Sequence, residues 1–193
     1  MIIKEYKLVS AEEDGTFPKL QVIHEYDYDP ECDFYVYYTG NKNYELEYFF
    51  FGEQLELQNN YVEHFYILSY NETGNIIGIM KLSSGSRKGT TLPYDALFTY
   101  LLLTGSYSFI TIHNHPNNYD QLSQEDIQTD HQLEYIANLL NINYRAGLII
   151  TKKQLSELYK KAYETEKDLF DEDDCLYIED NSRSERNEEK EEN

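Results

Sequence analysis

The alternation of hydrophobic and polar residues is clearest between residues 62 and 151. Two apolar, β-rich runs, VEHFYILSY and IIGIMKLS, flank the turn NETGN and predict a β-hairpin. PYDALFTYLLL has helical spacing, with Thr91 or Leu92 near its N-cap, proline in its first turn and Gly105 as its end. YSFITIHNH predicts a buried strand that leads directly into polar sequence.

A further helix and strand complete this region. Ser123 is a good N-cap, Glu125 and Asp126 lie in the first turn, and the helix is predicted to reach about Leu140. Its predicted apolar face comprises Ile127, Leu133, Ile136, Leu139 and Leu140. YRAGLIIT predicts a strand and KQLSELYKKAYETEKDLF a final helix. The order strand, strand, helix, strand, helix, strand, helix predicts an α/β sandwich with a mixed sheet.

The pattern is weaker towards both ends of the chain. Residues 1–9 predict an edge strand, residues 11–17 a loop, and KLQVIHEY a strand. CDFYVYY and YELEYFFFGEQL are aromatic-rich and fit either a strand or a short helix. After Asp171 the sequence is rich in acidic residues, Ser and Asn, which is typical of disorder.

The charge of the chain changes the range of plausible partners. The 36 acidic and 16 basic residues give a net charge of −20. From Glu164 onward there are 14 acidic and 4 basic residues, and the preceding sequence holds 22 and 12, so the body is acidic as well. Nucleic-acid binding depends mainly on Lys and Arg neutralising phosphates, so direct binding of DNA or RNA is disfavoured. Mimicry of nucleic acid by an acidic protein stays an alternative.

Cysteine usage and hydropathy indicate a cytoplasmic protein. Cys32 and Cys175 have no CxxC spacing, which argues against a disulfide framework or a thiolate zinc site. The N-terminus has no long apolar h-region, and the apolar run near Leu97–Leu103 is too short to span a bilayer. We therefore expect a cytoplasmic location and no membrane partner.

The densest group of chemically active residues lies in TIHNHPNNYDQLSQED. His113 and His115 leave a strand end at i and i+2, so both imidazoles point to one side and Asn114 points to the other. The following loop returns to a helix with Ser123 as N-cap, which can bring Asp126 to the histidines. Two imidazoles and one carboxylate with an open fourth position are the pattern of a catalytic zinc site.

This spacing, HxHP followed by six residues and SxxD, resembles the JAMM motif of the JAB/MPN metalloenzymes. The letters HNHP resemble the bacterial RadC-like branch, and Glu63 in YVEHFYILSYNETGNII is similar to the upstream glutamate of that branch. The resemblance spans roughly residues 1–151. It implies a cytidine-deaminase-like α/β sandwich with helices flanking a mixed sheet. We expect one domain over residues 1–165, with a divergent aromatic-rich segment at 16–61, and an acidic, disordered tail at 166–193.

The resemblance also implies a mechanism. His113, His115 and Asp126 would hold a zinc ion (Zn²⁺) beside a water molecule, and Glu63 would act as general base and then general acid. Ser123 would donate a hydrogen bond to the oxyanion of the tetrahedral intermediate. The implied activity is that of a metallopeptidase or isopeptidase acting on a peptide or protein-conjugate substrate.

Two departures from the pattern of the branch bear on substrate preference. The common Ser-Gly after HNHP is Asn117-Asn118, and the common Asp-His before the last strand is Ala146-Gly147. No helix-hairpin-helix region like that of full-length RadC is recognised, which again disfavours DNA binding.

Each candidate residue also has an ordinary structural interpretation. Ser123 alone would be a helix cap, Asp126 a first-turn acid and Glu63 a surface glutamate. The remaining histidines are less informative. His64 should face away from Glu63, His131 should lie on the helix surface, and His24 falls in a segment with a weak pattern. Ser84, Gly85 and Ser86 could line a substrate groove. Two non-hydrolytic alternatives remain for the whole chain. They are an acidic mobile-element protein that binds a host enzyme, and a RadC-type protein associated with DNA repair.

Overall fold

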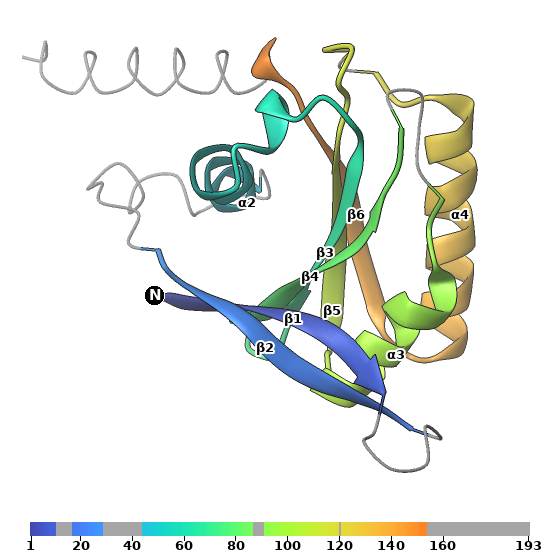
Figure 1. Cartoon of the computed structure of the whole chain (residues 1–193). Coiled ribbons are helices and arrows are strands. Elements are labelled where there is room, and N and C mark those ends of the chain that lie inside the picture. The colour runs from blue at the N-terminus through green and yellow to red at the C-terminus, as the bar shows by residue number, and fades with distance from the viewer. Residues whose placement is uncertain (11–16, 29–43, 87–90, 120, 154–193) are drawn as a thin grey trace, which may run out of the picture.

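A computed structural model describes residues 1–10, 17–28, 44–86, 91–119 and 121–153 of the chain. A six-stranded sheet runs through this part of the protein, with helices on both of its faces (Figure 1). The predicted α/β sandwich is therefore confirmed. The segment CDFYVYY, Cys32, Cys175, nearly all of the final predicted helix and the acidic tail lie outside the described residues.

The sheet is mixed, as predicted. Its strands are β1 (Ile2–Ser10), β2 (Pro18–Asp27), β3 (His64–Tyr70), β4 (Ile76–Ser84), β5 (Ser108–Asn114) and β6 (Asn143–Ile150). They lie in the order β2-β1-β4-β3-β5-β6. β1 is parallel to β4 and β5 is parallel to β6, whereas the other neighbouring pairs are antiparallel.

The expectation that the first strand forms an edge is wrong. β1 lies between β2 and β4, and β2 is the edge strand. Ile3 in β1 is completely buried, whereas almost every residue of β2 is exposed, so burial determines which strand lies inside. A Cβ atom on Gly78 in β4 would lie 2.5 Å from the carbonyl oxygen of Lys4 and 2.5 Å from the ring of Tyr6. The missing side chain therefore allows β1 to approach β4.

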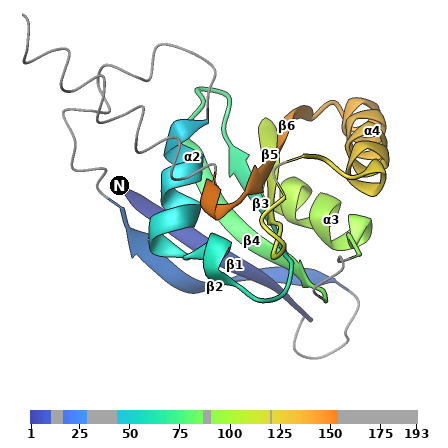
Figure 2. The same cartoon turned by 90° about the horizontal axis from the view of Figure 1, so that it is seen from above.

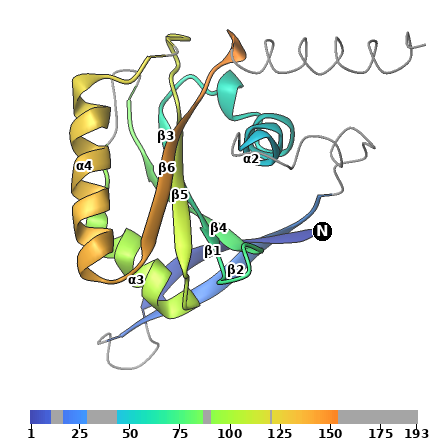
Figure 3. The same ribbon diagram turned by 180° about the vertical axis from the view of Figure 1, so that it is seen from behind.

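Two helices cover one face of the sheet, and a short helix covers the other (Figures 2 and 3). α3 (Tyr94–Thr104) and α4 (Gln124–Leu139) lie on the first face. The N-cap of α3 is Pro93, slightly later than predicted, and Gly105 ends the helix as predicted, with a left-handed backbone conformation.

The segment YELEYFFFGEQL is helical. It forms α2 (Glu45–Phe49) and continues as a π-helical turn (Phe50–Gln54), with a 3-10 turn (Leu57–Asn59) after it. Phe50 and Phe51 are buried and pack with Tyr66 and Ile112 of the sheet. This tertiary contact selects the helix, and periodicity alone does not distinguish it from a strand.

The predicted apolar face of α4 is partly wrong. Leu133 and Ala137 are buried, but Leu139 is 68 % exposed and the C-cap residue Leu140 is 39 % exposed. Leu139 follows Leu133 by six residues, which places it about 120° around the helix from Leu133 at 3.6 residues per turn. Ile142, beyond the end of the helix, fills the adjoining core instead.

The end of β5, the start of β3 and the end of β6 lie side by side at one end of the strands. The end of β5 lies beside the start of β3, where His113 pairs with Phe65. On its other side, Asn114 pairs with Ile150 at the end of β6. All residues of β5 are buried, on both faces of the sheet. α4 begins near the same end of β5 (Figure 1). No helix among the described residues is long and apolar enough to span a bilayer.

Candidate metal centre

The two histidines at the end of β5 point toward each other. Their Nε2 atoms lie 3.0 Å apart. His113 is 3 % exposed, and its ring stacks on Phe65 with centroids 5.3 Å apart and an interplanar angle of 3°. The period-2 geometry of the strand explains this arrangement, because residues i and i+2 share one side. Asn114 points away from both imidazoles, as predicted, and its amide contacts the start of β3.

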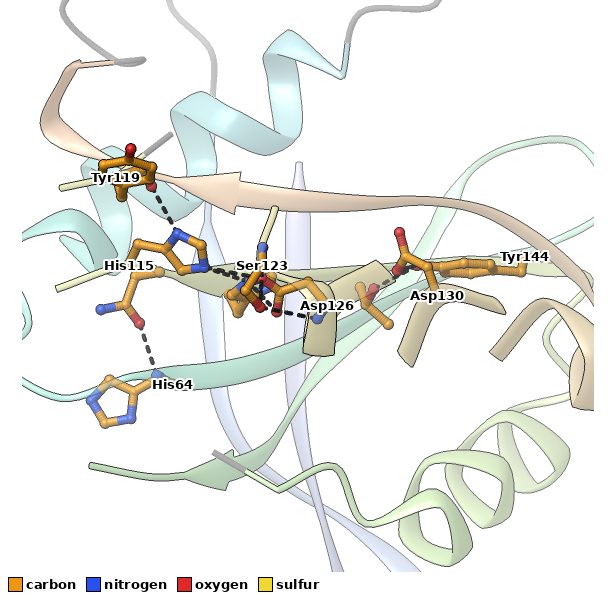
Figure 4. Close-up of polar contacts among 10 residues, drawn as sticks. His64, His115, Tyr119, Ser123, Asp126, Asp130 and Tyr144 are labelled. Carbon is orange, nitrogen blue, oxygen red and sulfur yellow. Dashed lines mark hydrogen bonds and ion pairs between the residues drawn. The ribbon is translucent and has the colours of Figure 1, made fainter. Parts of the chain in front are cut away.

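Asp126 reaches both histidines from the first turn of α4 (Figure 4). Its Oδ1 lies 3.3 Å from Nε2 of His113, and its Oδ2 lies 3.5 Å from Nε2 of His115. Ser123 is the N-cap, as predicted, in a reciprocal capping box with Asp126. The Ser123 backbone N–H and hydroxyl both donate to Oδ2 of Asp126, at 2.8 and 2.6 Å, and the Asp126 N–H donates to the Ser123 hydroxyl oxygen at 3.1 Å. The cap therefore fixes the direction of the carboxylate.

The loop after the histidines fixes the orientation of His115. Nδ1 of His115 lies 2.7 Å from the carbonyl oxygen of Tyr119, which can only accept, so Nδ1 carries the proton (Figure 4). Asn117 accepts a hydrogen bond from the Tyr119 N–H, and Asn118 accepts one from the Lys152 N–H. Asn118 has φ 64°, a conformation that Gly adopts freely and Asn tolerates. Asn118 thus takes a backbone conformation that a glycine at this position could also take.

The chemistry of these groups fits a divalent cation. With Nδ1 protonated, a neutral His115 presents a lone pair at Nε2, and the ionised Asp126 presents acceptors only. One ligand atom from each of His113, His115 and Asp126 lies within 4.8 Å of the others. Lone pairs that converge in this way can share a cation or a proton. Two imidazoles and one carboxylate are borderline ligands that suit zinc.

The same contacts shift the pKa values of Asp126 and His115. Burial tends to raise the pKa of Asp126, but the close contacts with the His113 and His115 rings and the hydrogen bond from Ser123 outweigh it and hold that pKa far below its ordinary value. Burial tends to lower the pKa of His115, but Asp126, the Tyr119 carbonyl and the charge of Glu63 together raise it. The carboxylate of Asp126 is therefore kept ionised, as a metal ligand must be.

Glu63 lies immediately before β3, close enough for its charge to act on His115. Its backbone N–H donates to the Ser86 carbonyl at 3.1 Å, and its carbonyl accepts from the Gly85 N–H at 2.8 Å. The predicted base and the three predicted ligands are thus brought to one edge of the sheet. Ser86 and Gly85 hold the backbone of Glu63, and their predicted role in lining a groove stays a prediction.

The other histidines lie away from this cluster. Nδ1 of His64 contacts the hydroxyl of Ser84 at 2.8 Å, and His131 is exposed on α4 as predicted. His24 packs its ring against Tyr26 on the edge strand, 4.3 Å between centroids.

A second polar group beside the cluster was missed by the sequence analysis. Tyr144 in β6 donates to Oδ1 of Asp130 at 2.6 Å, and its hydroxyl also lies 3.0 Å from that of Thr111 (Figure 4). Asp130 follows Asp126 by one helical turn, and this i, i+4 spacing is the signal that could have indicated it. A Cβ atom on Gly147 would lie 2.6 Å from Oδ1 of Asp130, so the glycine of Ala146-Gly147 makes room for this carboxylate.

Known proteins similar to this chain belong to one family. A family model described as "RadC-like JAB domain" matches residues 43–162. A UPF0758 protein of Coprothermobacter proteolyticus is 31 % identical over 98 residues, which is 51 % of this chain and 42 % of that protein. UPF0758 protein YsxA of Bacillus subtilis is 30 % identical over 101 residues, 52 % of this chain and 44 % of that protein.

A more distant relative extends the range of organisms. A UPF0758 protein of Methanospirillum hungatei is 26 % identical over 112 residues, 58 % of this chain and 50 % of that protein. The chain therefore matches no more than about half the length of these curated relatives. The matched region contains α2 to β6 and all of the cluster residues, whereas β1 and β2 lie before it.

Proposed function

The chain belongs to the RadC-like JAB domain family, and from that membership and the cluster at the end of β5 we propose that it is a zinc-dependent hydrolase of the JAMM type. The proposed reaction is hydrolysis of an amide, peptide or isopeptide bond. The proposed substrate is therefore a peptide or a protein conjugate.

The convergence of His113, His115 and Asp126 carries this proposal. Their ligand atoms lie within 4.8 Å of one another, and they come from a buried strand end and a capped helix start. Three nitrogen and oxygen ligands leave a position open for reaction, whereas structural zinc sites are closed and usually rich in cysteine. Bound there, a zinc ion would supply Lewis-acid polarisation of a carbonyl group and acidification of a water nucleophile.

Glu63 supplies the proton transfers in this proposal. Its carboxylate takes a proton from the attacking water as oxygen adds to the scissile carbonyl carbon. It then passes that proton to the nitrogen as the carbon–nitrogen bond breaks, which yields a carboxylic acid and an amine. General acid–base catalysis of this kind typically contributes about 10²–10⁴-fold to the rate. The hydrogen bonds of the Glu63 backbone to Gly85 and Ser86 support its fixed position.

The Ser123 hydroxyl has two roles in this proposal. In this structure its hydroxyl donates to Oδ2 of Asp126. In the proposed reaction the hydroxyl turns to donate to the oxyanion of the tetrahedral intermediate, while the Ser123 backbone N–H still donates to Oδ2 of Asp126. One such donor typically contributes roughly 3–4 kcal/mol of barrier lowering.

The proposal is tested by metal analysis combined with a cleavage assay. Protein purified from zinc-supplemented medium without chelators should contain about one zinc per chain, the stoichiometry of a single three-ligand site. The cleavage assay uses a pooled library of peptides and ε-lysine-linked isopeptides, with mass-spectrometric detection of new amines. Glu63→Gln should keep the zinc and lose cleavage, whereas His115→Ala and Asp126→Ala should lose both.

His131→Ala is the matched control, because this histidine lies exposed on α4 outside the cluster. It should retain zinc and cleavage at wild-type levels. Wild-type protein without zinc under these conditions would overturn the proposal, as would cleavage that survives in Glu63→Gln.

The charge of −20 favours a second candidate function. An acidic surface on the same fold could occupy the nucleic-acid site of an enzyme by charge mimicry. Inhibition of such an enzyme by the wild type should then persist in the double variant His115→Ala, Asp126→Ala. A wild type that inhibits no nucleic-acid enzyme would exclude this candidate.

A further inference from the structure

Asn114, the residue between the two histidines, bridges β5 to the segment that carries Glu63. Its side chain is almost completely buried, at 1 % exposure. The Nδ2–H group donates to the carbonyl oxygen of Val62 at 3.1 Å. The Oδ1 atom accepts from the backbone N–H of His64 at 2.8 Å (Figure 4). One side chain therefore binds the residues immediately before and after Glu63.

The path of the backbone explains why a side chain is needed here. Backbone pairing between β3 and β5 reaches Phe65 and His113 at this end and goes no further. β5 then stays with β6 instead: Asn114 pairs with Ile150, and the His115 N–H donates to the Ile150 carbonyl at 3.4 Å. The amide of Asn114 offers one acceptor and a donor group in a plane, as a peptide group does, so it prolongs the ladder across the gap.

The backbone of Glu63 is consequently held from two sides. Asn114 holds its neighbours on the β5 side, and on the β4 side Glu63 itself bonds to Ser86 and Gly85. In the extended backbone of β5, His113 and His115 face the cluster while Asn114 faces the other way. The peptide that carries the two imidazoles thus also fixes the start of β3.

We infer that Asn114 is a positioning residue that sets the place of Glu63 relative to His113 and His115. The inference rests on the proposed function for the chemical role of Glu63, whereas the clamp itself rests on the two hydrogen bonds. Misplacement of a reacting group by about 1 Å can cost about 10²-fold in rate. Fixing the backbone on both sides of Glu63 should therefore matter for the rate of the proposed reaction.

The test compares Asn114→Ala and Asn114→Asp with the control Asn71→Ala. Ala removes both bonds, and Asp keeps the acceptor for the His64 N–H but loses the donor to the Val62 carbonyl. Asn71 also accepts hydrogen bonds from backbone N–H groups, those of Thr73 and Asn75, but in the turn at the other end of β3. Its loss should affect stability without affecting Glu63.

Amide hydrogen exchange of the metal-free protein, followed by NMR, tests the clamp. In Asn114→Ala the His64 amide should exchange about tenfold faster, because a buried hydrogen bond of ordinary strength is lost. In Asn114→Asp it should stay closer to the wild type, and in Asn71→Ala it should be unchanged. An unchanged rate in Asn114→Ala would overturn the clamp.

Cobalt(II) added alone tests the effect on Glu63. The three ligands remain in every variant, so the Asn114 variants should bind cobalt with an affinity close to that of the wild type. The visible spectrum of cobalt-loaded Asn114→Ala should shift toward that of Glu63→Gln, whereas Asn71→Ala should keep the wild-type spectrum. With any substrate found by the cleavage assay, Asn114→Ala should lower kcat about 10²-fold and change KM little.

The two arms separate failure of the inference from failure of the proposed function. A wild-type cobalt spectrum and wild-type kcat in Asn114→Ala would show that the clamp does not position Glu63, which overturns the inference alone. Wild-type protein that binds no cobalt would overturn the proposed function and the role of Glu63 together, and the exchange rates would still decide whether the clamp exists.

Discussion

Ser123 and Asp126 hold each other across the first turn of α4. The carboxylate of Asp126 accepts from both the backbone N–H and the hydroxyl of Ser123, and the Asp126 N–H donates back to the hydroxyl oxygen. A capping box usually serves only to satisfy the free N–H groups at a helix start. Here its acidic member also faces two imidazoles, so the stability of the helix and the geometry of the candidate metal centre depend on the same bonds.

Ser123→Ala should therefore affect stability and zinc binding together. Loss of an N-cap side chain typically costs about 1 kcal/mol of unfolding free energy, and loss of a group that orients a ligand weakens metal affinity about 10–100-fold. Ser123→Thr keeps a capping hydroxyl and should restore most of both. Denaturant unfolding and competitive zinc titration measure the two effects. Wild-type zinc affinity in Ser123→Ala would show that the cap does not orient Asp126.

Local rules predicted much of the fold and of the candidate site. The hairpin β3–β4, the buried strand β5 and the start of α4 at Ser123 follow from alternation, burial pattern and capping preference, which act over a few residues. The spacing of the two histidines along an extended strand placed them on one side. These features need no knowledge of distant segments.

The features that were left open, predicted wrongly or missed depend on contacts between distant segments. The helical form of α2 depends on Phe50 and Phe51 packing under Tyr66, and the inner position of β1 depends on burial of Ile3. The pairing of Asp130 with Tyr144 joins residues from a helix and a strand. In each case, packing against a part of the chain far away in sequence selects among locally equivalent states.

Zinc should raise the thermal stability of the wild type. A ligand that binds only the folded state stabilises it by about 2.7 kcal/mol when present at about one hundred times its Kd. Asp126→Asn removes one ligand charge, so its Tm should respond far less to added zinc. His131→Ala is the control and should respond like the wild type, because its side chain is exposed outside the cluster. An equal response in all three proteins would place the binding elsewhere.

Buried tyrosines should limit stability at alkaline pH. Burial raises the pKa of Tyr66, Tyr70 and Tyr144 well above the ordinary value of 10.0. Each folded-state pKa lies above its unfolded value, so this contribution to stability is fully present below about pH 10 and is lost as pH rises toward the folded-state pKa. The unfolding free energy should therefore fall steeply above pH 10.

Tyr66→Phe should make that fall shallower, because it removes one group that ionises only on unfolding. Tyr107→Phe should leave the slope unchanged, since Tyr107 is 53 % exposed. Denaturant unfolding at a series of pH values gives the slope, and phenolate absorbance shows whether ionisation accompanies unfolding. Equal slopes in the wild type and Tyr66→Phe would contradict the prediction.

Gly147→Ala should destabilise the protein through Asp130. The new methyl group would lie 2.6 Å from Oδ1 of Asp130 and 2.9 Å from the Tyr144 hydroxyl, both closer than contact distance. Overpacking of this kind typically costs about 1–3 kcal/mol. If the clash pushes Asp130 outward, α4 is displaced at a point one helical turn after Asp126. Zinc affinity should therefore also fall.

The control for this effect is the same substitution in an Asp130→Ala background. Removing the Asp130 carboxylate relieves the closest contact, so Gly147→Ala should cost less there than in the wild type, with a coupling energy of about 0.5–3 kcal/mol. Unfolding free energies of the four proteins complete the cycle, and zinc titrations follow the metal centre. Additive free energies would show that Gly147 is needed for a reason other than space for Asp130. A coupling energy in this range would show that Asp130 and Gly147 pack as one unit beside the cluster of His113, His115 and Asp126.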